Sequence, residues 1–174
     1  MQRRDEMKAT KRIALDAMLA AMALLLFIVE AQIPPLTTIP GIKIGLANVV
    51  TLAAVYLCGR RDAAAILFVR VCLGAVFAGN ATTFLYSASG AMLCLILTCL
   101  VCRPLHKTVW VVSVLGAIAH NVGQLLAAAV LLRSAAVFWY LPYLLIAAVI
   151  SGAFTGLCVQ FLLRRLNRRK EEQP

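Results

Sequence analysis

The sequence contains little charge and very little acid. Charged residues make up 14% of the 174-residue chain, and only seven of them are Asp or Glu. Adjacent acids occur only near the two ends, as Asp5-Glu6 and Glu171-Glu172, so no acidic cluster can hold magnesium on a diphosphate. A phosphate-binding GxxxxGKS/T loop is missing, and no Ser-His-Asp or Cys-His set can be assembled. We therefore expect a protein that is not an enzyme and has no cofactor and no metal site.

The cysteines do not change this expectation. Cys99 and Cys102 have the CxxC spacing of some metal and redox sites, but they lie in an apolar segment without a second pair of ligands. The other four also lie in apolar segments or at the ends of such segments. We interpret all six as small apolar packing residues.

Apolar residues are what the sequence has in abundance. They make up 63% of the chain, with a mean hydropathy of +0.91, which is too apolar for a water-soluble domain. The prediction is an all-α membrane protein with a single integral membrane domain over residues 1–174, and the polar stretch 79–90 is interpreted as an outer loop over a cavity mouth. Six segments are predicted to be transmembrane helices: residues 9–29, 44–58, 63–78, 85–102, 108–132 and 142–163.

Positive charge is concentrated at the ends of the predicted spans. The net charge is +10, but all except three of the 17 Lys and Arg lie in residues 1–12, 60–61, 103–107 or 164–170. Six spans place all of these segments on one side, as the positive-inside rule requires of cytoplasmic segments. We therefore expect a multi-pass protein of the cell membrane with both termini in the cytoplasm. The basic residues orient the protein in the membrane and do not indicate nucleic-acid binding.

The fifth predicted span carries three strong hydrogen-bonding side chains. His120, Asn121 and Gln124 fall within an arc of about 100° on one side of a helix. In hydrocarbon each would cost on the order of kcal/mol unless it met a partner or water. Two interpretations remain open: a polar cluster that joins neighbouring spans, or the wall of a ligand pocket.

Arg70 lies near the middle of the third predicted span and needs a partner there. Asp16 is the first choice, and Glu30 or an anionic substrate are the alternatives. The two acids are about 21 Å apart along the first span, so they reach different depths.

Further polar residues gather toward the outer side of the predicted bundle. Together with the fifth span they form the distribution expected of a pocket that opens outward and is closed below. The candidate substrate-binding residues are Glu30, Lys43, Asn48, Arg70, Asn80, His120, Asn121 and Gln124.

A stripe of small residues lies on another side of the first span. Ala14, Ala17 and Ala21 fall within about 60° of arc, and such stripes allow helices to approach closely. The stripe serves either packing within the chain or contact with a partner protein.

Several motifs resemble those of a known family. The segments KRIALDAMLAAMALLLF, IPGIKIGLANVVTLAAVYLCG, RVCLG, HNVGQL and YLPYLLIAAVISGAFTG are similar to the Gx transporter family, also described as heptaprenyl diphosphate synthase component I. More broadly, the chain resembles the substrate-binding S components of energy-coupling factor (ECF) transporters.

The resemblance implies a six-helix S-component-like bundle with a ligand near the outer face. It also implies a transmembrane coupling subunit with two ATPases as partners, contacted through Ala14, Ala17 and Ala21. The synthase description fits poorly, because the diphosphate-binding acids of such enzymes are missing from this sequence.

Three functions follow as hypotheses. The first is a non-enzymatic subunit of an ECF-type uptake transporter that captures a small organic nutrient or precursor. The second is a membrane accessory protein for prenyl-diphosphate or quinone metabolism or for membrane redox work. The third is an autonomous, gradient-driven transporter with Asp16 or Glu30 as its proton carrier.

Overall fold

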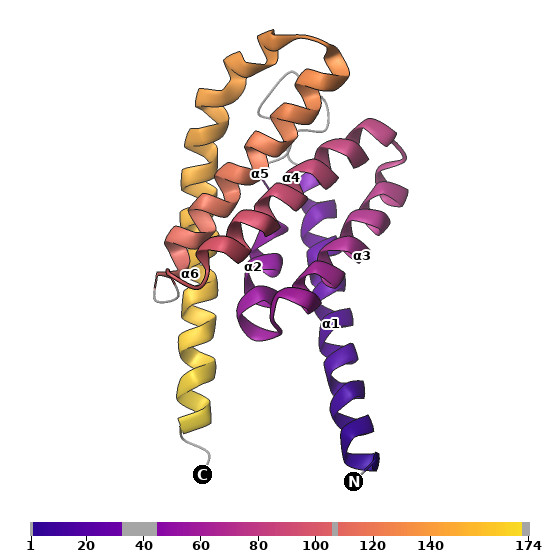
Figure 1. Ribbon diagram of the computed structural model, residues 1–174, viewed down its shortest axis with the longest axis vertical. Coiled ribbons are helices and arrows are strands. Elements are labelled where there is room, and N and C mark those ends of the chain that lie inside the picture. The colour runs from indigo at the N-terminus through magenta and orange to yellow at the C-terminus, as the bar shows by residue number, and fades with distance from the viewer. Residues whose placement is uncertain (1, 33–44, 106–107, 172–174) are drawn as a thin grey trace.

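A computed structural model describes residues 2–32, 45–105 and 108–171 of the chain (Figure 1). These ranges are almost entirely helical and contain no strand. They form six α-helices and one short 3-10 helix: α1 (Gln2–Ala31), α2 (Asn48–Leu57), α3 (Arg60–Ala78), α4 (Ala81–Val101), α5 (Val109–Leu132), η1 (Ala135–Tyr140) and α6 (Leu141–Glu171).

Four segments are long and apolar enough to cross a membrane. They are Thr10–Ala31 within α1, the whole of α4 and α5, and Ala135–Leu166, which joins η1 to most of α6. Large apolar side chains such as Phe68, Met92 and Phe161 are exposed on the outer faces of the helices, as expected of a surface that meets lipid. The chain is therefore a membrane protein.

The prediction of six transmembrane helices is wrong for two elements. The predicted span 44–58 is α2, whose ten residues rise only about 15 Å, half of a hydrocarbon core of ~30 Å. The predicted span 63–78 lies in α3, which is 19 residues long but begins with Arg60, Arg61 and Asp62 and carries Arg70 inside. Length excludes α2 and charge excludes α3 from the helices that can span a bilayer on their own.

Two boundaries also differ from the prediction. The charged N-terminal segment is helical, since α1 begins at Gln2. The stretch 79–90 is not a loop, because α4 begins at Ala81. Asn80 caps this helix, and its side-chain oxygen accepts a hydrogen bond from the backbone nitrogen of Thr82 at 2.9 Å.

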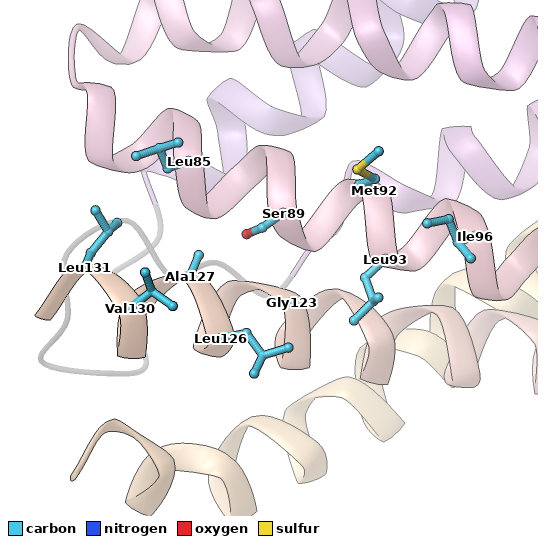
Figure 2. A pocket seen from close by; sticks show the side chains of 10 residues that line it. All are labelled: Leu85, Ser89, Met92, Leu93, Ile96, Gly123, Leu126, Ala127, Val130 and Leu131. Atoms are coloured by element: carbon cyan, nitrogen blue, oxygen red, sulfur yellow. The ribbon is translucent and has the colours of Figure 1, made fainter. Parts of the chain in front are cut away.

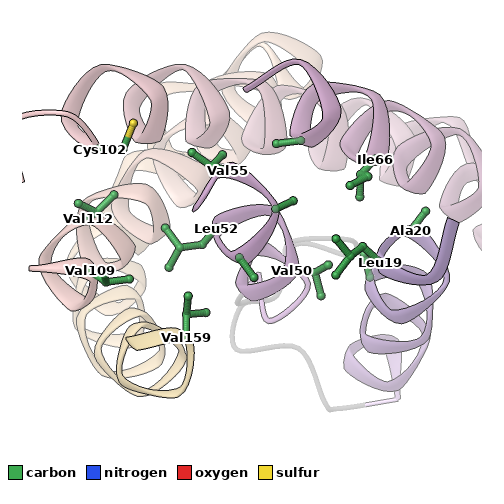
Figure 3. Packing of buried hydrophobic residues seen from close by; sticks show 14 residues of the cluster. Leu19, Ala20, Val50, Leu52, Val55, Ile66, Cys102, Val109, Val112 and Val159 are labelled. Atoms are coloured by element: carbon green, nitrogen blue, oxygen red, sulfur yellow. The ribbon is translucent and has the colours of Figure 1, made fainter. Parts of the chain in front are cut away.

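The short helix α2 is the centre of the bundle. It contacts α1, α3, α4, α5 and α6, and its residues from Val50 to Val55 are all buried. Figure 3 shows Val50, Leu52 and Val55 of α2 surrounded by apolar side chains such as Leu19 of α1 and Val159 of α6. The other helices cover α2 on all sides. It therefore does not have to be long enough to reach both membrane surfaces.

The other helices form two groups around α2. The most extensive packing is that of α5 against α4 and α6, while α1 packs on α2 and α3. The start of α1 and the end of α6 lie at the same end of the molecule, on opposite sides of it (Figure 1). The last residues of α1, the first of α2 and the middle of α3 and α5 supply the polar residues described next.

Candidate binding site

Glu30 fastens the beginning of α2 to the end of α1. Its carboxylate accepts hydrogen bonds from the backbone nitrogens of Gly45 and Leu46, the latter at 3.0 Å, and its side chain is buried. A carboxylate that accepts backbone N–H groups makes stronger hydrogen bonds than a neutral acceptor. The contact fixes the turn that precedes α2 and brings Gly45 and Asn48 into the interior.

Arg70 lies on the buried face of α3, which has the helical spacing Ala63, Ile66, Leu67, Arg70, Val71 and Gly74. The residue is only 2% exposed. Its guanidinium carbon lies 5.8 Å from the centre of the Phe27 ring, and its Nη2 donates to Asn48 Oδ1 at 3.4 Å. That hydrogen bond is longer than usual, and Nε has no hydrogen-bond partner.

The carboxylate whose charge acts on Arg70 is Glu30, not Asp16. Asp16 lies beside the thiol of Cys58, near the turn between α2 and α3. The predicted pairing of Arg70 with Asp16 is therefore wrong. Glu30, the alternative partner, is the acid whose charge acts on Arg70. In the described ranges the only ion pair within 4.0 Å is Arg12 with Asp62, so Glu30 influences Arg70 without touching it.

His120 closes the site from α5. A Cβ atom built on Gly45 would lie 2.7 Å from Asn48 Nδ2 and 3.0 Å from His120 Cδ2, so the three residues are in close contact. Gly45 also has φ +87°, a conformation that side chains with a Cβ rarely adopt. Only glycine lets the turn before α2 lie against the imidazole. His120 is buried, and its Nδ1 has no hydrogen-bond partner.

The close approach of α4 and α5 holds His120 in place. A Cβ on Gly90 would lie 2.8 Å from both Gln124 Cγ and the backbone oxygen of His120, and one on Gly123 would lie 2.7 Å from the backbone oxygen of Ser89. The two glycines allow this contact, and Gln124 is buried beside it. We call Glu30, Asn48, Arg70 and His120 the Arg70 cluster.

Asn121 faces another way and joins two helices. Its Nδ2 donates to the backbone oxygen of Leu144 in α6 at 2.8 Å, while its Oδ1 has no partner. Further along the same pair of helices, the hydroxyls of Ser113 and Thr155 lie 3.0 Å apart. Of the three polar residues predicted on one arc of α5, Asn121 thus serves helix packing.

A small cavity adjoins Asn48 of the Arg70 cluster, and the other three residues of the cluster do not line it. It measures about 10 Å³, close to the space of one water molecule, and is lined by Gly45, Asn48 and the hydroxyl-bearing Thr98, Ser113, Ser151 and Thr155, among others. Sequence reasoning did not select Ser113, Ser151 or Thr155, because Ser and Thr are ordinary in membrane helices.

The remaining predicted site residues lie elsewhere. Asn80 is exposed as the cap of α4 and lines a separate hollow of about 440 Å³ at the turn between α3 and α4. Lys43 lies outside the described residues. Ala14, Ala17 and Ala21 are exposed on the face of α1 that points away from its buried residues Leu19, Ala23 and Phe27, so the stripe does not pack inside the chain.

A groove of about 480 Å³ runs along the outer surface between α4 and α5. Figure 2 shows its wall of apolar side chains, including Met92, Leu93 and Leu126, with Ser89 as the one hydroxyl among them. Gly90 and Gly123, where the two helices touch, lie between this groove and the buried His120 and Gln124. The groove is therefore a surface separate from the polar site.

No group of three or more His, Cys, Asp or Glu side chains in the described part of the chain is arranged to hold a metal ion. The groups that gather at the Arg70 cluster are one cation, one carboxylate, one imidazole and one amide. This arrangement suits hydrogen bonding and charge recognition of a small polar molecule.

Comparison with known proteins gives one match. A family model described as heptaprenyl diphosphate synthase component I matches residues 19–162. No curated protein and no solved structure matches the chain. The matched segment contains all four residues of the Arg70 cluster, the second part of α1, the whole of α2 to α5 and most of α6, and it confirms the family named from the motifs. The chain belongs to the heptaprenyl diphosphate synthase component I family.

Proposed function

We propose that this protein is a non-catalytic membrane subunit that captures a small organic molecule for an ECF-type uptake transporter. The observation that carries the proposal is the Arg70 cluster, which places buried polar groups with open hydrogen-bonding capacity inside a bundle whose outer faces are apolar. Such groups are costly in a membrane protein, and they are retained where they recognise a ligand. The "component I" of the family's description fits a protein that works with others.

Capture is tested by native mass spectrometry of the freshly purified full chain. We expect a small organic molecule to be released on activation, and we expect the Arg70→Gln variant to carry less of it. A chain that never retains a small molecule, and that no candidate metabolite stabilises against heating, would contradict the proposal.

The exposed alanines of α1 support a partner of the kind that an uptake transporter needs. Ala14, Ala17 and Ala21 form an open face on which another helix can approach closely. In this proposal the partner is a transmembrane coupling subunit that carries two ATPases.

Docking is tested by replacing Ala17 with Trp and copurifying the chain with that subunit. Because Ala17 is exposed, we expect the variant to fold normally while assembly falls at least tenfold, since an indole blocks close helix contact. Met22→Trp is the matched control, because Met22 is 51% exposed on a different side of α1. Equal assembly of the two variants would show that the coupling subunit binds elsewhere.

A second candidate is supported by the groove between α4 and α5. An accessory protein for prenyl-diphosphate metabolism would need an apolar surface for a prenyl chain, and the family's description names such a metabolite. Chemical analysis of the molecules that copurify with the chain separates the two candidates, because a prenyl lipid supports the second and a water-soluble metabolite supports the first.

A further inference from the structure

Three buried nitrogen atoms around Arg70 have no hydrogen-bond partner. They are Nε of Arg70, Nδ2 of Asn48 and Nδ1 of His120. The first two always carry hydrogen, and the third carries hydrogen in one neutral tautomer and in the charged form. A buried donor without an acceptor has lost its hydrogen bonds to water and gained none in the protein, so three of them in one place require an explanation.

The acceptors in the neighbourhood are already engaged. Both oxygens of Glu30 accept from backbone nitrogens of the turn before α2, and Asn48 Oδ1 accepts from Arg70. What the cluster offers to an incoming molecule is therefore a set of donors, one of which belongs to a permanent cation.

The charge balance points the same way. Among the described residues no carboxylate lies within ion-pair distance of Arg70. Arg70 itself is only 2% exposed. A buried cation in this situation gains most from an anion that brings its own acceptors.

We propose, building on the ligand-capturing function above, that the molecule captured is an anion whose carboxylate or phosphate group is held by Arg70 and Asn48. The planar guanidinium offers Nε and an Nη on one edge, which matches two oxygens of either group. The Asn48 amide supplies a further N–H, and His120 supplies another from the opposite helix.

The space beside the cluster is too small for a whole metabolite. The cavity beside Asn48 measures about 10 Å³, room for about one water molecule, and of the cluster only Asn48 lines it. The cluster therefore holds the charged end of a ligand, and the same chemistry serves a free anion or an anionic lipid headgroup.

The proposal is tested with inorganic phosphate and acetate as probes, and with choline and glycerol as the cationic and neutral comparisons. The full chain is placed in phosphatidylcholine nanodiscs, and dissociation constants are obtained from the thermal shift as a function of probe concentration. We expect phosphate or acetate to bind, and choline and glycerol not to.

Asn48→Asp is the most informative variant. It keeps the shape of the side chain and gives Arg70 a carboxylate, so we expect it to fold even if Arg70→Gln does not. We expect both variants to weaken anion binding by a factor of about 10 to 100, as for loss of a hydrogen bond to a buried charge. Arg103→Gln, at an exposed turn, is the control and should bind as the wild type does.

The outcomes separate this inference from the proposed function. Anion affinity that Asn48→Asp leaves unchanged would overturn the inference, as would choline or glycerol binding that replaces anion binding, and in the latter case ligand capture stands. Failure of every probe, together with no retained molecule, would overturn both. Stabilisation by phosphatidylglycerol that is lost in Asn48→Asp would support the inference with a lipid headgroup as the anion.

Discussion

Arg12 and Arg70 are two arginines of one chain in opposite surroundings. Arg12 is at the surface, and its Nε and Nη2 each lie 2.7 Å from an oxygen of Asp62, which ties α1 to the start of α3. Arg70 is buried, and its one side-chain hydrogen bond is a long contact of 3.4 Å to an amide. The exposed arginine thus has an ideal partner, while the buried one has an incomplete set.

The fold would be more stable if the buried arginine had the complete ion pair and the exposed arginine had the incomplete set of partners. An exposed ion pair contributes little to stability, whereas a buried charge requires compensation. The helix bundle compensates Arg70 only in part, through the charge of Glu30, the ring of Phe27 and the oxygen of Asn48. The difference indicates that the Arg12 pair is structural and that Arg70 is held for a ligand.

The largest effect is expected from removing the carboxylate near the buried arginine. Glu30→Ala loses two hydrogen bonds from the turn before α2 and leaves Arg70 without its nearest negative charge. We expect the free energy of unfolding to fall by about 3–5 kcal/mol, as for breaking a buried charged network. Reversible unfolding in mixed micelles with increasing dodecyl sulfate measures it.

Asp16→Ala is the matched control for this variant, because Asp16 is another acid of α1 and its charge does not act on Arg70. If Asp16→Ala lowers the free energy of unfolding as much as Glu30→Ala does, the Arg70 cluster contributes no more to stability than a half-buried acid outside it.

The polar residues of the Arg70 cluster could be predicted, and two of them stand out as strong hydrogen-bonding groups inside apolar segments. Arg70 and His120 are predicted on this ground, Glu30 and Asn48 are predicted because polar residues gather toward the outer side, and the structure brings the four together. The choice of Asp16 for Arg70 failed because sequence gives only depth along a helix. Which turn of α1 crosses α3 depends on packing, here on Phe27 lying against Gly74.

The glycines and the short helix could not be predicted in the same way. Gly45 and Gly90 matter because of what a Cβ would touch on a neighbouring helix, and sequence does not show neighbours. The apolar run that contains α2 has the composition of a transmembrane helix, because a helix buried in protein and a helix buried in lipid are both made of apolar residues. Its central position becomes visible only when the other five helices are seen around it (Figure 1).

An intermediate effect is expected at Asn121, which sharpens the comparison because it is a buried polar residue with a good partner. Asn121→Ala removes the hydrogen bond to Leu144 that joins α5 to α6. We expect a loss of about 1–2 kcal/mol in unfolding free energy. Binding of phosphate or acetate should stay within twofold of the wild type. A variant of normal stability with impaired binding would place Asn121 in the ligand site instead.

The smallest effect is expected at the exposed pair. The Arg12 guanidinium holds the pKa of the Asp62 carboxyl below its usual range, mainly through the hydrogen bond between them. The pair therefore stabilises the fold fully above the ordinary pKa of Asp, and this contribution disappears as the pH falls through the lowered pKa. Asp62→Asn should reduce the melting temperature only slightly at neutral pH. The difference from wild type should vanish in strong acid and shrink in high salt, because exposed charges are screened. Melting curves of both proteins across this pH range, at low and high salt, provide the measurement. A large loss at neutral pH that salt does not reduce would show that the Arg12 pair is as important to the fold as the Arg70 cluster, and the contrast between the two arginines would fail.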